Sequence, residues 1–370
     1  MYPQVVPPTA AEPGRTEVTS EWLRRDISAA SNVIVIMMRK GGAGKTTMTL
    51  LLADALARFG LSVLVVDMDP QGNSSIGLGK HVELVEVGRT RIGDRPILEP
   101  TELTVCEVID SGEPGVADEA IAMVDWGYDP AAAFERGGPL FPGQVGAIGV
   151  IPCYKKLESD VPRWTTPKDL ERLGSALLLS GQNGVAAPHR RWDVVLIDTP
   201  PGGSLISVQA AKAAFWALLV APPASFAAAA VPETMELLLD IKDGYDHDEL
   251  DILGLVINDL VTQTRLTQRN ILGQLDERHR GGERLFRAPI WPVTVPRYTV
   301  VQDSQAANAP VSAFLADRAS RETARRVCQA AEANALHMLH AISHPQAASI
   351  QRAWAAAWPR HVRPDFITET

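Results

Sequence analysis

The residues with the clearest chemical potential form a glycine-rich segment near the start of the chain, which reads Lys40-Gly41-Gly42-Ala43-Gly44-Lys45-Thr46-Thr47. Glycines let the backbone curl so that successive N–H groups point at phosphate oxygens. A helix that begins directly after them adds the positive end of its dipole. We expect Lys45 to reach the β and γ phosphates of a nucleotide and the Thr46 hydroxyl to bind Mg²⁺. Residues 40–47 are therefore predicted to form a phosphate loop.

The start of this loop departs from the usual pattern G-x-x-x-x-G-K-T. Arg39 stands where that pattern has its first glycine, and a second lysine, Lys40, follows it. A lysine in this place cannot easily reach phosphates bound by its own loop. Across a dimer interface it could neutralise charge on the nucleotide of a second copy, as an arginine finger does. The alternative is an exposed Lys40 with a purely structural role.

Two apolar, strand-like runs end in carboxylates. The first ends at Asp67 and continues as Met68-Asp69-Pro70-Gln71-Gly72, and the second ends at Asp198. A lone aspartate in this place is more often a turn former or a helix cap. Beside a phosphate loop, it lies where an attacking water or a metal would sit. We expect Asp198 to face Mg²⁺, through a water, as in a Walker B motif.

Alternating strands and helices must position these groups. Apolar runs predict strands at Val33–Met38, Ser62–Asp67, Ala147–Ile151, Val194–Ile197, Ala217–Ala221, Ile252–Ile257 and Ala288–Val295. Helical spacing predicts helices at Glu21–Ala30, Thr46–Phe59, Thr104–Asp110, Ala117–Val124, Ala313–Ile342 and Ala348–Trp358, while the stretch Gly79–Gly146 gives no clear overall pattern. This order predicts an α/β fold with a doubly wound, mostly parallel sheet, helices on both faces and a ligand at the carboxyl ends of the strands.

Composition limits the classes of protein that remain. The chain has 370 residues, of which 46% are hydrophobic and 21% charged, as in a globular protein and unlike collagen, disordered or coiled-coil chains. No run of about 18 apolar residues is free of charge and proline, and the N-terminus lacks the pattern of a secretory signal. The three cysteines, Cys106, Cys153 and Cys328, form neither a disulfide framework nor a metal-binding pair. We expect a cytoplasmic protein without a membrane partner.

Charge is unevenly distributed. The net charge of −9 argues against a protein whose whole surface binds polyanions. Residues 261–370, however, hold 14 arginines and no lysine against nine acidic residues. This part of the chain forms either a local basic patch or a solvated, arginine-rich helical surface. For the chain as a whole we expect a flexible lead with a possible short helix (1–30), an ATPase domain (31–340) and a helical tail (341–370).

Three segments together resemble the deviant Walker A ATPases of the ParA/MinD type. They are the loop K-G-G-x-G-K-T-T, the segment D-x-D-P-Q-G-N at Asp67–Asn73 and the segment I-D-T-P-P at Ile197–Pro201. With weaker similarity elsewhere, the resemblance covers about residues 31–340. The second segment points to the ParA partition branch. The resemblance implies the P-loop NTPase fold, a slow ATPase activity, and ATP and Mg²⁺ as cofactors.

The resemblance also implies roles for single residues. ATP would be sandwiched in a homodimer, with Lys40 reaching the phosphates of the other subunit. Asp69 would position the attacking water, and Asp67 would lie close to Lys45 and the metal. The nucleotide would be held by the loop from Lys40 through Thr47, with Pro296 and Arg297 bordering the adenine and Asn258 near it.

In that family, the ATP-bound dimer binds DNA without sequence preference and associates with the nucleoid. A ParB-like partner, a centromere-binding or adaptor protein, then stimulates hydrolysis and so drives plasmid or chromosome partition. Candidate DNA contacts here are Arg265, Arg269 and Arg287, with Arg278, Arg280 and Arg284 nearby. The family's late loop commonly reads P-R-N-V-R, whereas this chain reads Pro296-Arg297-Tyr298-Thr299-Val300, so that Val300 replaces the second arginine.

Two related functions remain open. A ParA-like ATPase can position another cargo, such as a microcompartment or a receptor cluster, and sequence separates this poorly from DNA partition. A MinD-like membrane switch needs a basic amphipathic C-terminal helix. Ile350, Trp354 and Trp358 do share a helix face, but Pro359 interrupts it and the tail ends with acidic residues, which favours interior packing or a partner contact. The missing cysteine pairs exclude an iron–sulfur carrier.

Overall fold

The computed structural model describes residues 32–91, 94–113, 115–164, 166–178, 191–222, 227–245, 247–258 and 289–358. Its centre is a seven-stranded sheet with the order β5-β6-β2-β7-β1-β8-β9. The strands are β1 (Val33–Met37), β2 (Val63–Asp67), β5 (Ala122–Met123), β6 (Ile148–Ile151), β7 (Val194–Asp198), β8 (Trp216–Ala221) and β9 (Asp251–Ile257). All neighbours pair in parallel except β5, an antiparallel edge strand on β6. The predicted fold class is therefore confirmed.

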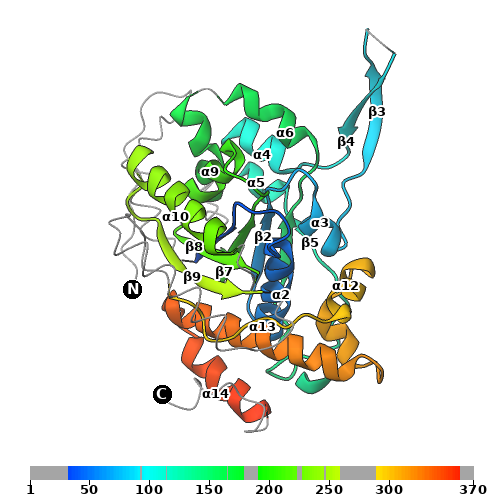
Figure 1. Cartoon of the computed structure of the whole chain (residues 1–370). Helices are drawn as coiled ribbons and strands as arrows, with labels where there is room; N and C mark the ends of the chain where they lie inside the picture. The colour runs from blue at the N-terminus through cyan, green and yellow to red at the C-terminus, as the bar shows by residue number, and fades with distance from the viewer. Residues whose placement is uncertain are drawn as a thin grey trace, which may run out of the picture.

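Helices cover both faces of this sheet (Figure 1). Alternate residues of β1 face opposite layers, with Ile34 and Ile36 in one core and Val33 and Val35 in the other. The first layer contains α2 (Lys45–Arg58), α13 (Arg321–Ala341) and α14 (Ala347–Ala357), and the second contains α4 (Val105–Ser111), α7 (Arg172–Leu178), α9 (Leu205–Lys212) and α10 (Ala227–Gly244). Because both faces are buried, the central strands are apolar throughout, which made them readable from sequence.

The first two strands and the helix predicted between them form a βαβ unit. β1 leads through the phosphate loop into α2, and Gly60 ends the helix with φ +88°, a conformation that favours glycine. Short elements complete the body: α3 (Asn73–Gly77), α5 (Val116–Glu119), α6 (Lys156–Asp160), α12 (Thr299–Ala306) and the 3₁₀ turns η1 (Phe134–Arg136), η2 (Val161–Arg163), η3 (Pro167–Glu171) and η4 (Val311–Leu315).

Three predicted elements differ from the structure. The helix predicted at Ala117–Val124 is wrong beyond α5, because residues 122–123 pair with β6 as strand β5. The strand predicted at Ala288–Val295 is replaced by one bridge, from Ile290 to Leu255, since the prolines at 289 and 292 have no N–H to donate. The long helix predicted at Ala313–Ile342 is broken into η4 and α13. The helix predicted at Glu21–Ala30 and the DNA-contact arginines predicted between 265 and 287 lie outside the described residues.

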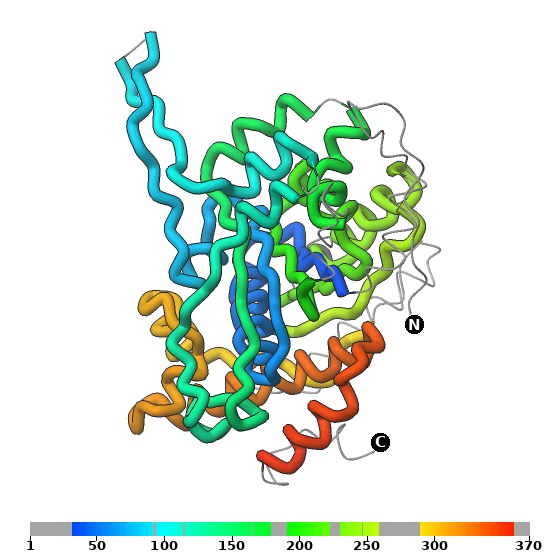
Figure 2. The backbone as a smooth tube through the Cα atoms, turned by 180° about the vertical axis from the view of Figure 1, so that it is seen from behind, coloured from blue at the N-terminus to red at the C-terminus, as the bar shows by residue number. Residues whose placement is uncertain are grey.

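The stretch without a clear sequence pattern contains a β-hairpin. Strands β3 (Leu84–Arg89) and β4 (Pro96–Pro100) pair with each other in a separate antiparallel ribbon, with a bulge between Glu86 and Gly88. We call residues 84–100 the arm. It extends away from the body past α4 and α6, and the view from behind shows the same projection (Figures 1 and 2).

The last described helix, α14, packs into the core together with Trp358. On α14, Ile350 and Trp354 are fully buried, and Trp358 is 2% exposed. The indole N–H groups of Trp354 and Trp358 both donate to Glu332 Oε2 on α13, at 2.7 Å each. The apolar face considered for a membrane switch is thus interior, which agrees with the first of the two alternatives, interior packing or a partner contact. Within the described ranges, no helix is long and apolar enough to cross a membrane.

Candidate nucleotide-binding site

The phosphate loop bends tightly between β1 and α2. Gly42 and Gly44 have φ angles of +72° and +90°, which L side chains rarely adopt. A Cβ atom at Gly44 would also lie 1.7 Å from Asn258 Nδ2. The Asn258 amide in turn donates to the Ala43 carbonyl at 3.3 Å. The Asn258 side chain therefore holds the loop through the Ala43 carbonyl. Glycine is required at position 44 because of its positive φ and because a Cβ atom there would clash with Asn258.

The start of α2 offers its backbone dipole to an anion. No side chain caps the helix, and its first turn has no acidic residue. The first N–H groups of a helix have no intrahelical partners, and they carry a partial positive charge. An uncapped helix start behind a glycine loop is a binding site for phosphate.

Lys45 lies buried at this helix start. Its Nζ donates to the Met38 carbonyl at 3.2 Å, which leaves further N–H donors for phosphate oxygens. Burial lowers the pKa of Lys45, and the negative charges of Asp198 and Asp69 oppose that shift. These two carboxylates thus favour the charged ammonium in a desolvated place.

Asp198 connects the phosphate loop to the segment after β2. Its Oδ2 accepts hydrogen bonds from the hydroxyls of Thr46 at 2.7 Å and Ser74 at 2.6 Å. Its Oδ1 is buried and has no hydrogen-bond partner among the described residues. Burial raises the pKa of Asp198, and the two hydroxyls and the Lys45 charge oppose the shift.

This arrangement fits Mg²⁺. An unpartnered buried carboxylate oxygen next to a threonine hydroxyl supplies hard oxygen ligands, which Mg²⁺ prefers. In the part of the chain that the structure describes, no group of three or more His, Cys, Asp or Glu side chains could hold a metal alone. Mg²⁺ usually takes one or two protein ligands together with substrate phosphates and waters, so this small ligand set is sufficient.

Asp67 and Asp69 occupy different environments. Asp67 pairs with Asp198 in the β2–β7 register and is fully buried. Its oxygens accept the N–H of Asp69 and both the N–H and the hydroxyl of Ser75, so its carboxylate fixes the segment after β2. Burial and the neighbouring Asp198 raise the pKa of Asp67. Asp69 is 7% exposed, and its Oδ1 accepts the Gln71 N–H at 2.9 Å.

The remaining predicted residues lie around the same edge. The Val295 N–H donates to the Ile257 carbonyl, so Pro296 and Arg297 follow directly beside Asn258. Pro296 is half-buried and Arg297 is exposed. Lys40 is half-buried, and Gly41 lies against the Pro201 ring.

Arg39, in place of the usual glycine, is fixed through its backbone. Its N–H donates to the Thr234 hydroxyl at 3.1 Å, and its carbonyl accepts the Gly202 N–H at 2.6 Å. Val300, at the position of the family's second late-loop arginine, is buried and packs in the α13 layer. Its apolar side chain therefore cannot reach DNA.

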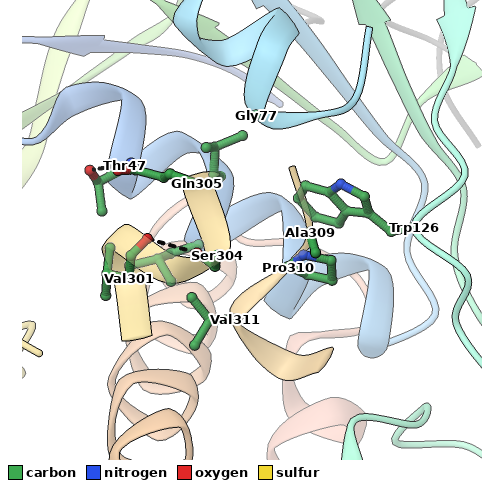
Figure 3. Close-up of a pocket in the computed structure, with 11 residues that line it drawn as sticks. Thr47, Gly77, Trp126, Val301, Ser304, Gln305, Ala309, Pro310 and Val311 are labelled. Atoms are coloured by element: carbon green, nitrogen blue, oxygen red, sulfur yellow. Dashed lines mark hydrogen bonds between the residues drawn. The ribbon is translucent and has the colours of Figure 1, made fainter. Parts of the chain in front are cut away.

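The Thr47 side chain faces α12. Its Oγ1 accepts a hydrogen bond from Gln305 Nε2 on α12 at 3.1 Å, as Figure 3 shows. Behind this pair lies a cavity of about 20 Å³, which Trp126 and Pro310 help to line. A cavity of this size holds about one water molecule, so it does not take a nucleotide base.

Sequence reasoning missed four hydroxyl side chains that build the site. Ser74 and Ser75 hold Asp198 and Asp67, the Thr199 hydroxyl donates to the Ile36 carbonyl at 2.7 Å, and Thr234 holds Arg39. Serine and threonine are common in turns, so residue type alone gave no signal. The position of the two serines directly after the D-x-D-P-Q-G-N segment was the available signal.

The chain is similar to known proteins in sequence and in fold. The family model described as the CobQ/CobB/MinD/ParA nucleotide binding domain matches residues 34–311. The chromosome partitioning protein ParA of Caulobacter vibrioides is 28% identical over 283 residues, which cover 75% of this chain and 85% of that protein. The chromosome-partitioning ATPase Soj of Thermus thermophilus is 27% identical over 264 residues, covering 71% and 80%. A solved structure of pNOB8 ParA bound to nonspecific DNA shares the fold, with a TM-score of 0.55, 15% identity and coverage of 84% and 98%.

Proposed function

This chain belongs to the CobQ/CobB/MinD/ParA family of nucleotide-binding domains, and we propose that it is an ATPase that dimerises when it binds ATP, binds DNA non-specifically in that state and drives plasmid or chromosome partition. The observation that carries the proposal is the Asp198 carboxylate. It joins Thr46 of the phosphate loop to Ser74 and keeps one oxygen free beside the buried Lys45. A strand-end carboxylate so placed serves nucleotide hydrolysis.

The residues divide the work of hydrolysis. Backbone N–H groups of residues 41–47 and the Lys45 ammonium bind the phosphates, and Thr46 and Asp198 would hold Mg²⁺, which neutralises developing phosphate charge when bound. The Asp69 carboxylate accepts a hydrogen bond from the attacking water and orients it. The water oxygen bonds to the γ phosphorus, and the bond from that phosphorus to the β–γ bridging oxygen breaks. ADP leaves with the electron pair of the broken bond, and both protons of the water leave on the phosphate as H₂PO₄⁻. Lys40 of a second copy stabilises the charge from the other side.

ATP binding is coupled to DNA binding through dimerisation. Two copies that face each other over ATP align two basic surfaces, and each additional phosphate contact strengthens binding to DNA. The arginine excess in residues 261–370 and the nonspecific DNA in the pNOB8 ParA structure support this step. Since Val300 is buried, the DNA contacts must come from other residues, and we assign them to Arg265, Arg269 and Arg287. A ParB-like partner stimulates hydrolysis and releases the dimer.

The test of nucleotide binding is Lys45→Ala, measured as the affinity for a fluorescent ATP analogue. We expect at least a tenfold loss, because a buried, charge-assisted phosphate contact is removed. Lys168→Ala, at an exposed lysine in η3 and outside the loop, is the matched control. Unchanged affinity in Lys45→Ala would overturn the site.

The test of function is retention on DNA with ATP, with ADP and without nucleotide, across a salt series. The proposal expects retention with ATP alone and a steep loss with salt. A protein that dimerises with ATP but ignores DNA would instead be a positioning ATPase for another cargo.

A further inference from the structure

The arm carries most of the large apolar side chains that are exposed in the described part of the chain. Of the seven large apolar side chains that are exposed in the described part of the chain, five lie on the arm. They are Leu84, Val85, Val87, Ile97 and Leu98, with exposed fractions from 41% to 53%. A cluster of this kind on a projecting element marks an interaction surface.

The arm lacks the contacts that stabilise a ribbon. An isolated two-stranded hairpin is marginally stable in water, and both of its edges present open backbone groups. Arg89 forms ion pairs with Glu86 and Asp94 at 2.9 Å each, but these side chains are exposed, and exposed pairs add little stability. Among the described strands, β3 and β4 pair only with each other, so a partner that covered the ribbon would stabilise it.

Both faces of the ribbon are apolar. Leu84 shares one face with Glu86 and with Leu98, the cross-strand partner of Glu86. Val85 points to the other face, opposite Glu99. The mixture of apolar side chains and carboxylates is suited to protein contact and unsuited to a phosphate backbone.

The charges at the tip of the arm are opposite in sign to those at its base. Near the tip lie Arg91 and Arg95, and near the base lie Glu83 and Glu99. Within the described ranges, none of these four side chains forms an ion pair. Two arms packed antiparallel about a two-fold axis would place the basic tip of each beside the acidic base of the other.

The arm begins where a second copy is expected. It follows α3, which comes directly after the segment that carries Asp67 and Asp69. This is the carboxyl edge of the sheet, where the phosphate loop also lies. Two copies that face each other across this edge bring their arms together.

We propose that the arm packs antiparallel against the arm of a second copy and so stabilises the dimer. The inference rests on the proposed ATP-dependent dimer and adds a contact outside the nucleotide site. DNA is the disfavoured occupant, because residues 80–102 hold five acidic residues against four Lys and Arg, with Glu86 and Glu99 on the strands themselves.

The first test is cross-linking of full-length protein. Cys106, Cys153 and Cys328 are buried, so a new surface cysteine is the preferred target of a bismaleimide. We expect Val87→Cys, near the middle of the arm, to cross-link two copies when a non-hydrolysable ATP analogue is present. Met123→Cys is the matched control, since Met123 and Val87 are both 53% exposed. Equal cross-linking of the two variants would overturn the proposal.

The second test is charge exchange. Arg91→Glu with Arg95→Glu should weaken the ATP-dependent dimer about tenfold, measured by sedimentation, and adding Glu83→Arg with Glu99→Arg should restore it. Binding of the ATP analogue by the monomer should not change. A charge-reversed variant that dimerises like the wild type would overturn the arm contact. If that variant dimerised normally but was no longer retained on DNA, the arm would be a DNA-binding segment instead. A wild-type chain that binds ATP and stays monomeric would overturn the proposed function itself.

Discussion

Asp198 combines a costly environment with a necessary chemical role. Its carboxylate is fully buried, and one oxygen has no hydrogen-bond partner in the described structure. Burying a charge disfavours its ionised form, and in the proposed complex Mg²⁺ bound together with nucleotide would compensate the Asp198 charge. The site is therefore less stable empty than filled.

We accordingly expect Asp198→Asn to raise the free energy of unfolding without nucleotide by about 1–2 kcal/mol. The neutral amide removes a buried charge and its repulsion of Asp67, its oxygen still accepts from Thr46 and Ser74, and Asp69 still supplies a negative charge near Lys45. Mg²⁺-dependent nucleotide affinity should fall. Urea unfolding and nucleotide titrations with and without Mg²⁺ measure the two effects. A variant that keeps Mg²⁺-dependent binding would contradict the role given to Asp198.

Gly44 and Gly42 form a natural matched pair. Both have positive φ, but only at Gly44 would a Cβ atom meet a neighbour, namely Asn258. Gly42→Ala should cost about 1–2 kcal/mol of stability through backbone strain, and Gly44→Ala about 1–3 kcal/mol more through the added clash. Thermal unfolding compares the two variants. Adding Asn258→Ala to Gly44→Ala should recover the part due to the clash, and no recovery would assign the whole loss to strain.

Residue spacing predicted the loop and its two strand-end carboxylates because these groups follow apolar strands at fixed distances. It did not predict that Asn258 lies over Gly44, since the two are far apart in sequence and no motif links them. The contact depends on the parallel pairing that brings the end of β9 to the end of β1 through β8.

At the scale of elements, the far end of α2 is held by a buried ion pair. Arg58 contacts Glu332 of α13 at 2.6 Å, and both side chains are almost fully buried. Arg58 also donates to the carbonyls of Phe134 and Gly138. The helix that begins at the phosphate loop is thus fixed to α13 at its other end.

Glu332→Gln should destabilise the fold by about 3–5 kcal/mol, because it leaves the Arg58 charge buried without its counter-ion. Glu322→Gln is the control on the same helix. Glu322 pairs with Arg325 and Arg326 at the surface, where the loss should be at most about 1 kcal/mol. Equal losses by denaturant unfolding would show that burial does not distinguish the two pairs.

The sequence predicted an element correctly where its apolar residues followed one clear pattern, either the continuous run of a buried strand or the spacing of a helix. The fully apolar strands and α2 were found, whereas β5 was read as helix because Ala122 and Met123 are too short a run to show a strand period. The arm escaped prediction for a related reason. Its strands carry apolar residues on both faces, interrupted by charge and by the bulge at Val87, so neither a buried nor a half-exposed strand pattern emerged.

At the scale of the whole molecule, a substitution at Lys40 can separate nucleotide binding from assembly of the proposed dimer. We expect Lys40→Ala to bind ATP as a monomer with little loss, because Lys45 and the loop backbone still hold the phosphates. The ATP-dependent dimer should not form, since the partner's phosphates lose a neutralising charge. Light scattering after gel filtration with a slowly hydrolysed analogue measures this. If Lys40→Ala formed the dimer with normal affinity, Lys40 would have only a structural role. Lys168→Ala is the control.

The family match ends at residue 311, but the packed interior continues well beyond it. A chain shortened to the matched region would lose α13, and with it the carboxylate that neutralises Arg58. A cut after residue 346 would spare α13 but take away both indole donors and leave Glu332 Oε2 without them. Shortened versions of this protein should therefore aggregate or unfold when the family match alone sets their boundaries, and a shortened version should retain the chain at least through Trp358.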